Sequence, residues 1–173
     1  MNAPGNVTRA RPIPELGPEL DFLRLLWRLD HALQRRSKRM QRELGVTGPQ
    51  RLALRIVGRF PGISTGDLAR LLHVHPSTLS GIHERLEARG WIVRRSDPTD
   101  RRRVLLGLTE AGRRLDAEDA VTIERAMRDC LSAASPAQLE AARELLLHLA
   151  AGLETQPPPS DGSARLAARK TKR

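Results

Sequence analysis

The 173-residue chain is poor in aromatic residues and in cysteine. It contains two Phe, two Trp and no Tyr, whereas Leu occurs 27 times. Because β-strands draw on aromatic and β-branched residues, this balance favours a helical protein over a β-sandwich. The single cysteine, Cys130, excludes an internal disulfide framework and a metal cage built only from cysteines.

Long apolar runs and catalytic motifs are missing as well. No segment approaches the roughly 18 apolar residues that span a bilayer, and the N-terminal residues lack the apolar stretch of a secretory signal. A soluble, cytoplasmic protein is therefore expected, with one domain and appendages. The sequence has no GxGxxG or GxxxxGK phosphate loop and no HExxH pair, so it predicts neither an enzyme nor a cofactor. His73 and His75 alone do not make a metal site.

Acidic residues are scarce in the middle of the chain. The whole chain carries 30 basic and 20 acidic side chains, a formal net charge of +10. Residues 19–114 contain twenty basic and ten acidic side chains, whereas residues 115–154 contain eight acidic and three basic ones. A domain this basic usually has a polyanionic partner, most often nucleic acid. The middle segment is therefore the expected anion-binding part, although a merely charged, soluble surface is the alternative.

Hydrophobic spacing predicts a series of helices. Apolar residues recur at mostly helical spacing over 15–44, Gly45 ends that helix, and Thr47 can cap a second helix that runs to Arg59. Further helices are expected over 65–72 with Ser64 as N-cap, 77–89 ended by Gly90, 109–131, and 136–153. Residues 1–14 and 155–173 are rich in proline and are expected to be disordered. The basic C-terminal tail could attract phosphates or only keep the protein soluble.

The helical period changes after Gly90. Residues 91–93 and 104–108 are short, β-prone apolar runs on either side of a polar, turn-rich segment, which predicts a hairpin. The order helix, short helix, tight turn, helix and hairpin is that of a winged helix-turn-helix. The helix 77–89 can enter a major groove, which admits one α-helix, and arginines on a thin hairpin suit a narrow minor groove. The candidate DNA contacts are Ser77, Thr78, Ser80, Arg85, Arg94, Arg95, Arg101, Arg102 and Arg103.

Residues 77–112 (STLSGIHERLEARGWIVRRSDPTDRRRVLLGLTEAG) resemble the signature of the MarR family of bacterial transcriptional regulators. The matching motifs are S-T-L-S, R-L-E-x-x-G, the wing tip D-P-x-D-R-R and L-x-L-T-x-x-G. Residues 64–74 also resemble the first helix of the family's motif, and the resemblance covers about residues 15–153. It implies a mainly α fold with a small β-wing, in which 45–108 form the DNA-binding lobe and 15–44 and 109–154 form dimerisation helices.

The resemblance also implies a function, that of a ligand-responsive repressor which binds a pseudo-palindromic operator as a homodimer. It assigns Arg102 to the minor groove and a bracing role in the wing to Asp100, which can pair with a nearby arginine. Ser77, Thr78, Ser80 and Arg85 match contact positions of the recognition helix. Many members carry Arg where this chain has Gly81, which removes one contact and leaves the operator sequence open.

Three alternatives remain at this level. Trp27, Arg28 and His31 lie within about one helical turn and could bind an aromatic or anionic effector, although Trp27 is equally suited to a core. Cys130 is either a structural residue or a redox sensor; relatives that sense peroxide use a cysteine near the N-terminus, which this chain lacks. A winged helix can also serve as a protein–protein module, but Arg102 and the Ser/Thr face favour DNA.

Overall fold

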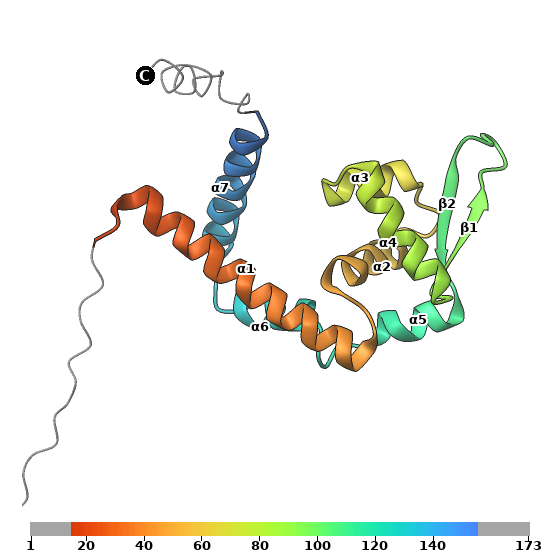
Figure 1. The fold of residues 1–173 in the computed structure, drawn as a ribbon, viewed down its shortest axis with the longest axis horizontal. Helices are drawn as coiled ribbons and strands as arrows, with labels where there is room; N and C mark the ends of the chain where they lie inside the picture. Colours follow the sequence, from red (N-terminus) through yellow and green to blue (C-terminus); the bar gives the residue numbers. More distant parts are fainter. Residues whose placement is uncertain (1–14, 156–173) are drawn as a thin grey trace, which may run out of the picture. The chain divides into compact units, whose positions relative to one another are not determined.

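The computed structural model describes residues 15–155, which form two compact units that divide between Ala126 and Met127. The first unit contains α1 (Gly17–Leu44), α2 (Gly48–Arg59), α3 (Thr65–Leu72), α4 (Pro76–Ala88), β1 (Ile92–Ser96), β2 (Val104–Leu108), α5 (Glu110–Ala117) and the first turn of α6 (Ile123–Leu131) (Figure 1). The second unit contains the rest of α6 and α7 (Pro136–Thr155).

The expected mainly helical winged fold is confirmed. The disorder expected for 1–14 and 155–173 concerns residues outside the described part, except Thr155, which ends α7. Among the described helices, none is both long enough and apolar enough to cross a membrane.

Local capping sets the helix boundaries of the first unit. Thr47 and Gln50 form a reciprocal capping box at the start of α2, and the Ser64 hydroxyl accepts a backbone N–H in the first turn of α3 at 3.1 Å. Gly45 ends α1 with φ 74°, and Gly90 follows α4 with φ 67°, a left-handed conformation that glycine adopts without strain. The capping residues are those that the sequence predicts, although α1 begins at Gly17 rather than at residue 15 and α4 ends at Ala88 rather than at residue 89.

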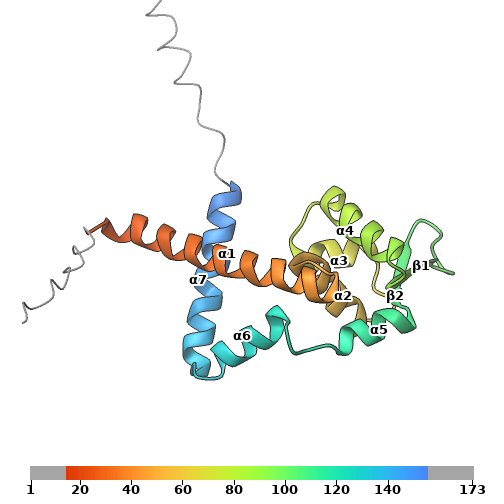
Figure 2. The same ribbon diagram turned by 60° about the horizontal axis from the view of Figure 1, so that its bottom comes forward.

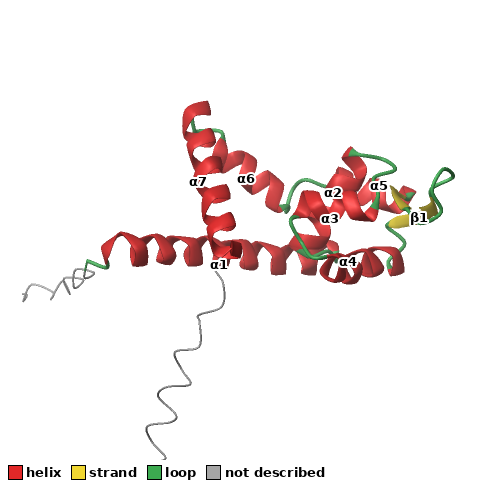
Figure 3. Ribbon diagram, turned by 90° about the horizontal axis from the view of Figure 1, so that it is seen from above, coloured by secondary structure: helices red, strands yellow, loops and turns green. Residues whose placement is uncertain are grey.

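The wing is an antiparallel pair in which Ile92 lies opposite Leu108 and Ser96 opposite Val104 (Figure 3). The first strand is longer than the predicted 91–93, because the pairing with β2 continues through Arg94, Arg95 and Ser96. The segment before α3 joins the other edge of β2: Leu106 donates its N–H to the Ile63 carbonyl at 2.9 Å. The hairpin is therefore anchored to the helix-turn-helix through the middle of β2.

The L-T-x-x-G motif joins the end of α4, the wing and α5. The Thr109 hydroxyl donates to the Gly90 carbonyl at 2.6 Å and accepts the Gly112 N–H at 2.9 Å. A Cβ at Gly112 would lie 1.9 Å from the Trp91 carbonyl oxygen, so only glycine fits there. This close approach fixes where the chain leaves the wing.

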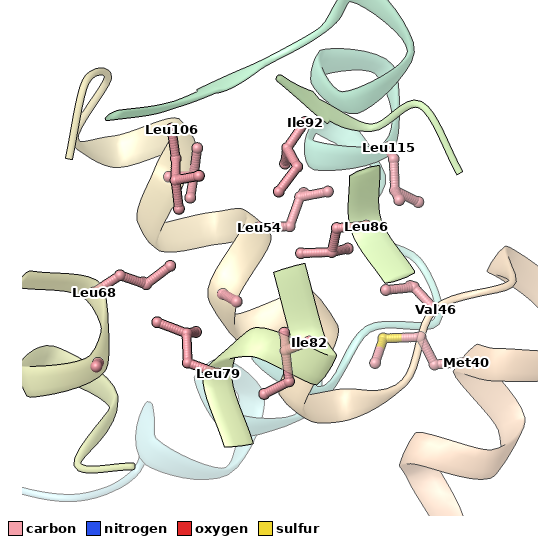
Figure 4. Close-up of a cluster of buried hydrophobic side chains, with 13 residues drawn as sticks. Met40, Val46, Leu54, Leu68, Leu79, Ile82, Leu86, Ile92, Leu106 and Leu115 are labelled. Carbon is pink, nitrogen blue, oxygen red and sulfur yellow. The ribbon is translucent and has the colours of Figure 1, made fainter. Parts of the chain in front are cut away.

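Helix α2 lies at the centre of the first unit and contacts α1, α3, α4, α5 and β2. Its Leu54 packs in a core to which α3 contributes Leu68 and β2 contributes Leu106 (Figure 4). One face of α4 packs into this core, and all of its apolar members are buried; they are Leu79, Ile82 and Leu86. The core thus holds α4 by one face and leaves its other face outside.

The single helix predicted over 109–131 is wrong. Helix α5 ends at Ala117, and α6 begins only at Ile123. Thr122 starts the new helix, because its hydroxyl accepts the Arg125 N–H at 3.2 Å and donates to the Asp119 carbonyl at 2.9 Å. The physical reason for the break lies on α2.

Arg51 of α2 is only 2% exposed and holds the end of α5. Its guanidinium donates to the carbonyl of Leu115, to that of Asp116 at 3.2 Å and to that of Glu118 at 2.7 Å. Its Nε donates to Glu124 at 2.7 Å. Carbonyls in the last turn of a helix have no intrahelical donor, so the arginine supplies the missing partners and stabilises the break.

A second buried polar group, His83, lies on the inner side of α4. It is buried, and its Nδ1 has no hydrogen-bond partner in the described part of the chain. Burial lowers the pKa of His83 below its ordinary value, and the charge of Arg94 lowers it further, whereas Glu84 and Glu87 oppose the shift. The imidazole is therefore held in its neutral form.

We expect Arg51→Ala to destabilise the protein by about 3 to 5 kcal/mol, because it removes the buried partner of the Glu124 carboxylate and the donor to the Glu118 carbonyl. The Asp116 carbonyl keeps a donor, since Arg55 also donates to it at 2.9 Å. Arg55 is a matched control one turn away, with a 44% exposed side chain that pairs with Asp116 at 2.9 Å. Arg55→Ala should cost about 1 kcal/mol or less. Urea unfolding of both variants measures the difference, and equal losses would contradict the capping role of Arg51.

We expect His83 to make stability fall as the solution is acidified below neutral pH. The unfolded chain binds a proton on this imidazole near its ordinary pKa, whereas the folded chain does so only at lower pH. Stability is therefore lost as pH falls from about 6.5 toward the depressed folded pKa. His83→Gln should flatten this part of the stability profile, measured as the unfolding free energy between pH 5 and 8. The same substitution at the exposed His31 is the control, and an unchanged profile in His83→Gln would refute the assignment.

Candidate nucleic-acid interface

Helix α4 lies next to the wing and contacts it through β1 (Figure 2). The helix begins at Pro76 rather than at the predicted Ser77, because His75 is its N-cap. The Nδ1 atom of His75 accepts the Ser77 N–H at 3.3 Å and lies 2.8 Å from the Ser77 hydroxyl. The Ser80 hydroxyl donates back to the Pro76 carbonyl at 3.1 Å. Both serines thus have local partners.

The remaining candidates on α4 are more available. Thr78 and Arg85 are exposed, and their side chains make no hydrogen bond or ion pair to any described residue. At Gly81 an added Cβ would meet no atom within 4 Å, so this position faces open space on the same helix. The outer face of α4 therefore offers a hydroxyl and a guanidinium, separated by a flat position where a side chain is missing.

The tip of the wing is folded around Asp97, which sequence reasoning did not single out. Asp97 is 8% exposed, and its Oδ1 accepts the backbone N–H of Thr99 at 2.8 Å and the Thr99 hydroxyl at 2.6 Å. The hydrogen bonds from Thr99 hold the pKa of Asp97 below its ordinary value. The Asp97 N–H also donates to the Arg103 carbonyl at 3.0 Å, which closes the tip.

The sequence had suggested that Asp100 pairs with the side chain of an arginine. In the structure, Asp100 contacts the backbone of the tip instead. Its Oδ1 accepts the Arg102 N–H at 3.0 Å, and its carbonyl accepts the Arg103 N–H at 2.9 Å. Such a turn orders the peptide that carries Arg102. The bracing role of Asp100 in DNA binding remains a prediction, to which this contact gives a concrete form.

The five candidate arginines of the wing divide into two groups. Arg103 pairs with Asp67 of α3 at 3.2 Å, and Arg94 pairs with Glu87 of α4 at 3.6 Å. The other three are exposed and form no ion pair within residues 15–155; they are Arg95, Arg101 and Arg102. Charge alone does not distinguish these groups, but their partners do.

Asp67 connects the wing to the helix-turn-helix. Its carboxylate accepts the Ser64 hydroxyl at 2.6 Å and pairs with both Arg70 and Arg103. The Ser64 hydrogen bond, followed by that of Arg70, holds the pKa of Asp67 below its ordinary value. This carboxylate therefore stays charged and tethers the wing through Arg103.

The predicted effector residues on α1 do not form an enclosed site in the chain. Trp27 is 64% exposed, so its interpretation as core is wrong for the described chain. Arg28 is exposed, and the exposed His31 places Nδ1 2.7 Å from the Trp27 carbonyl. A cavity of about 420 Å³ lies instead beside the following turns of α1, lined also by α2 and by the start of α6.

The described residues hold no metal cluster, and they do not decide between the two interpretations of Cys130. No cluster of three or more His, Cys, Asp or Glu side chains that could hold a metal occurs between 15 and 155. Cys130 is exposed on α6. These observations leave the polar face of α4 and the unpaired arginines of the wing as the candidate interface.

The chain is similar to known proteins in sequence and in structure. Residues 44–103 match the sequence profile of the MarR family. The chain is 31% identical over 102 residues to an HTH-type transcriptional repressor of Mycobacterium tuberculosis, which covers 59% of this chain and 73% of that one. It is also 31% identical over 99 residues to the organic hydroperoxide resistance transcriptional regulator of Bacillus subtilis, covering 57% of this chain and 67% of that one.

The fold is similar to that of solved regulators. The transcriptional regulator SlyA has a TM-score of 0.64 and 25% identity over 77% of this chain and 94% of its own. PcaV from Streptomyces coelicolor, in complex with its natural ligand, has a TM-score of 0.64 and 26% identity over 81% of this chain and 97% of its own. A complex of S. aureus MepR with DNA shares the fold, with a TM-score of 0.64 at 22% identity over 76% and 97% of the two chains.

Each of these comparisons leads to the same group of non-enzymatic DNA-binding proteins. The repressor of M. tuberculosis is matched over nearly three quarters of its length, and the family profile covers the segment that contains α4 and the wing tip. The chain belongs to the MarR family of transcriptional regulators.

Proposed function

We propose that the protein is a homodimeric repressor that binds a pseudo-palindromic operator, with α4 in the major groove and Arg102 in the minor groove, and that a small effector modulates this binding. The similar proteins of Mycobacterium are named as repressors. Related folds have been solved with DNA, as for MepR and for FabT of Streptococcus pneumoniae, and with a ligand, as for PcaV. These names support the repressor role, the DNA partner and the response to a ligand.

The observation that carries the proposal is the state of the arginines at the wing tip. Arg101 and Arg102 are exposed and unpaired within the described chain, whereas the peptide between Asp97 and Arg103 is held by hydrogen bonds from both ends. A side chain on an ordered backbone loses less conformational entropy on binding than one on a free loop. Its charge also gains from the negative potential of a narrow minor groove.

The remaining candidates take supporting roles in the proposal. Thr78 and Arg85 reach base edges or phosphates from α4, and Ser77 and Ser80 contribute after exchanging their local hydrogen bonds. Arg95 contacts phosphates from the strand. Arg94 and Arg103 are already paired, so they set the position of the wing more than they add affinity.

Exposed leucines on the terminal helices support dimerisation. In the first unit, α1 exposes Leu20, Leu23 and Trp27. In the second unit, α7 exposes apolar side chains on several sides; they are Leu139, Leu145, Leu146, Leu147 and Leu153. Large apolar surfaces of this kind mark interaction sites. A second copy that covers 15–44 and 109–154 would also complete any effector site that includes Trp27, Arg28 and His31.

We expect the wing variants to separate charge from position. The operator is first selected from a pool of random duplexes, and affinity is then measured on operator and random duplex over a range of salt. Arg102→Ala should weaken the free energy of operator binding by about 1–3 kcal/mol. For the wild type, the slope of log affinity against log salt concentration should steepen by about 0.9 for each phosphate neutralised. Arg94→Ala is the matched control, and it should weaken all sequences by a smaller and uniform amount because Arg94 is paired with Glu87.

Asp100→Ala distinguishes bracing from simple electrostatics. The variant removes a negative charge, which by itself should strengthen DNA binding, yet it also removes the acceptor that orders the Arg102 peptide. We expect it to imitate Arg102→Ala. Tighter operator binding by Asp100→Ala, or an affinity of the wild type that stays flat with salt, would contradict the proposed role of the wing.

We expect deletion of residues 136–154 to abolish dimerisation and operator binding together, because the two lobes must reach half-sites about one helical turn apart. Sedimentation measures the oligomeric state, and circular dichroism checks that the lobe is still folded. Leu146→Glu should weaken the dimer, whereas Glu144→Gln, a charge change on the same helix, is the control. A truncated monomer that still binds the full operator tightly would rule out the dimer.

A further inference from the structure

The cavity beside α1 has an unusual lining for a protein with so many basic residues. It measures about 420 Å³, within the range of small-molecule sites, and lies entirely in the first unit. Its walls come from α1, the start of α2, the α3–α4 turn, Ile82 of α4 and the first turn of α6. Most of the lining is aliphatic, which suits the apolar body of a ligand.

The polar residues of this lining are acidic or neutral. Asp30, Gln34 and Ser37 lie along one face of α1, and Glu124 lies across the cavity on α6. None of the twelve lining residues, all of them in the described part of the chain, is Arg, Lys or His. An anionic ligand would therefore meet two carboxylates and no cation among the lining residues, although Arg51 and Arg55 lie beside Glu124 outside the lining. A positive charge in the cavity would be attracted by Asp30 and by the oxygen of Glu124 that these arginines do not engage.

Glu124 has an acceptor to spare. Its Oε1 accepts the Arg51 Nε at 2.7 Å and lies 3.8 Å from the Arg55 Nε. Its Oε2 is buried and has no hydrogen-bond partner among the described residues. A buried carboxylate oxygen without a donor is costly. Since Arg51 engages Oε1, Oε2 is the oxygen of Glu124 that is left to accept a hydrogen bond from a donor in the cavity.

We propose that this cavity binds a cationic amphiphile, an apolar molecule with a protonated amine. The amine donates to Glu124 Oε2, Asp30 adds attraction at the exposed rim, and the apolar body packs against Leu33, Leu52 and Val74. This inference rests on the ligand response proposed above and names the ligand class. The ligand proposed here has the opposite charge to the anionic effector that was expected from Trp27, Arg28 and His31.

Three probes with one ring system and different charges test the inference on the full chain without DNA. They are naphthylmethylamine, which is protonated at neutral pH, naphthylmethanol and naphthoate, and calorimetry gives the dissociation constant of each. We expect the amine to bind about tenfold more tightly than the alcohol, as one charge-assisted hydrogen bond provides, and naphthoate to bind most weakly.

Four variants localise the effect. Glu124→Gln should remove most of the preference for the amine, and Asp30→Asn should reduce this preference by about threefold. Asp30 is exposed and does not contact Arg51, so Asp30→Asn still tests the site if Glu124→Gln fails to fold. Gln34→Lys should reverse the order and favour naphthoate. Glu43→Gln lies on α1 outside the cavity, pairs with Arg39, and should change nothing.

The outcomes separate this inference from the function on which it rests. Naphthoate binding as tightly as the amine, or an amine affinity unchanged in Asp30→Asn, Glu124→Gln and Gln34→Lys alike, would overturn the ligand class. Operator binding is measured separately without any probe, so its loss would overturn the proposed function and leave the calorimetry intact. An amine that binds as expected and leaves operator affinity unchanged would support the site and refute the ligand response.

Discussion

The buried guanidinium of Arg51 is the interaction on which the rest of the first unit depends. It lies on the central helix α2, which packs against α1, α3, α4, α5 and β2. Its donors satisfy three carbonyls and one carboxylate at once. A planar fork with five donors can do this, whereas the single ammonium of a lysine cannot span the same acceptors. By holding Glu118 and Glu124, Arg51 sets the point at which the chain leaves α5 and begins α6.

The wing shows how ion pairs give different roles to residues with the same charge. Arg103 and Arg94 are engaged with carboxylates on α3 and α4, so they connect the hairpin to the helices behind it. Arg101 and Arg102 keep their charge unengaged within the described chain. A net charge of +10 predicts a polyanionic partner, but only the pairing within the fold indicates which arginines are left to meet it.

Sequence reasoning succeeded where structure is decided by neighbouring residues. The caps at Thr47 and Ser64 and the glycines at 45 and 90 were predictable because each acts within one turn of its own helix. The break after Ala117 was not, since its cause, Arg51, lies more than sixty residues earlier. Periodicity also could not show that Asp97 closes the wing tip, although the Asp97-Pro98-Thr99 sequence contains the necessary donor and acceptor. In the same way, the cavity joins Asp30 to Glu124, which only the fold brings together.

The long reach of Arg51 also bears on how the lobe is made during translation. The segment that matches the family, residues 44–103, contains both the recognition helix and the wing tip. The acceptors of Arg51 lie at Leu115, Asp116, Glu118 and Glu124, 64 to 73 residues after it. A nascent chain that has emerged only as far as β2 thus has its DNA-contacting surface but leaves a charged group in its core without partners. The lobe is complete only when the ribosome has released α5 and the first turn of α6. The chain therefore acquires a stable DNA-binding lobe only after the segment that leads to its second unit has been synthesised.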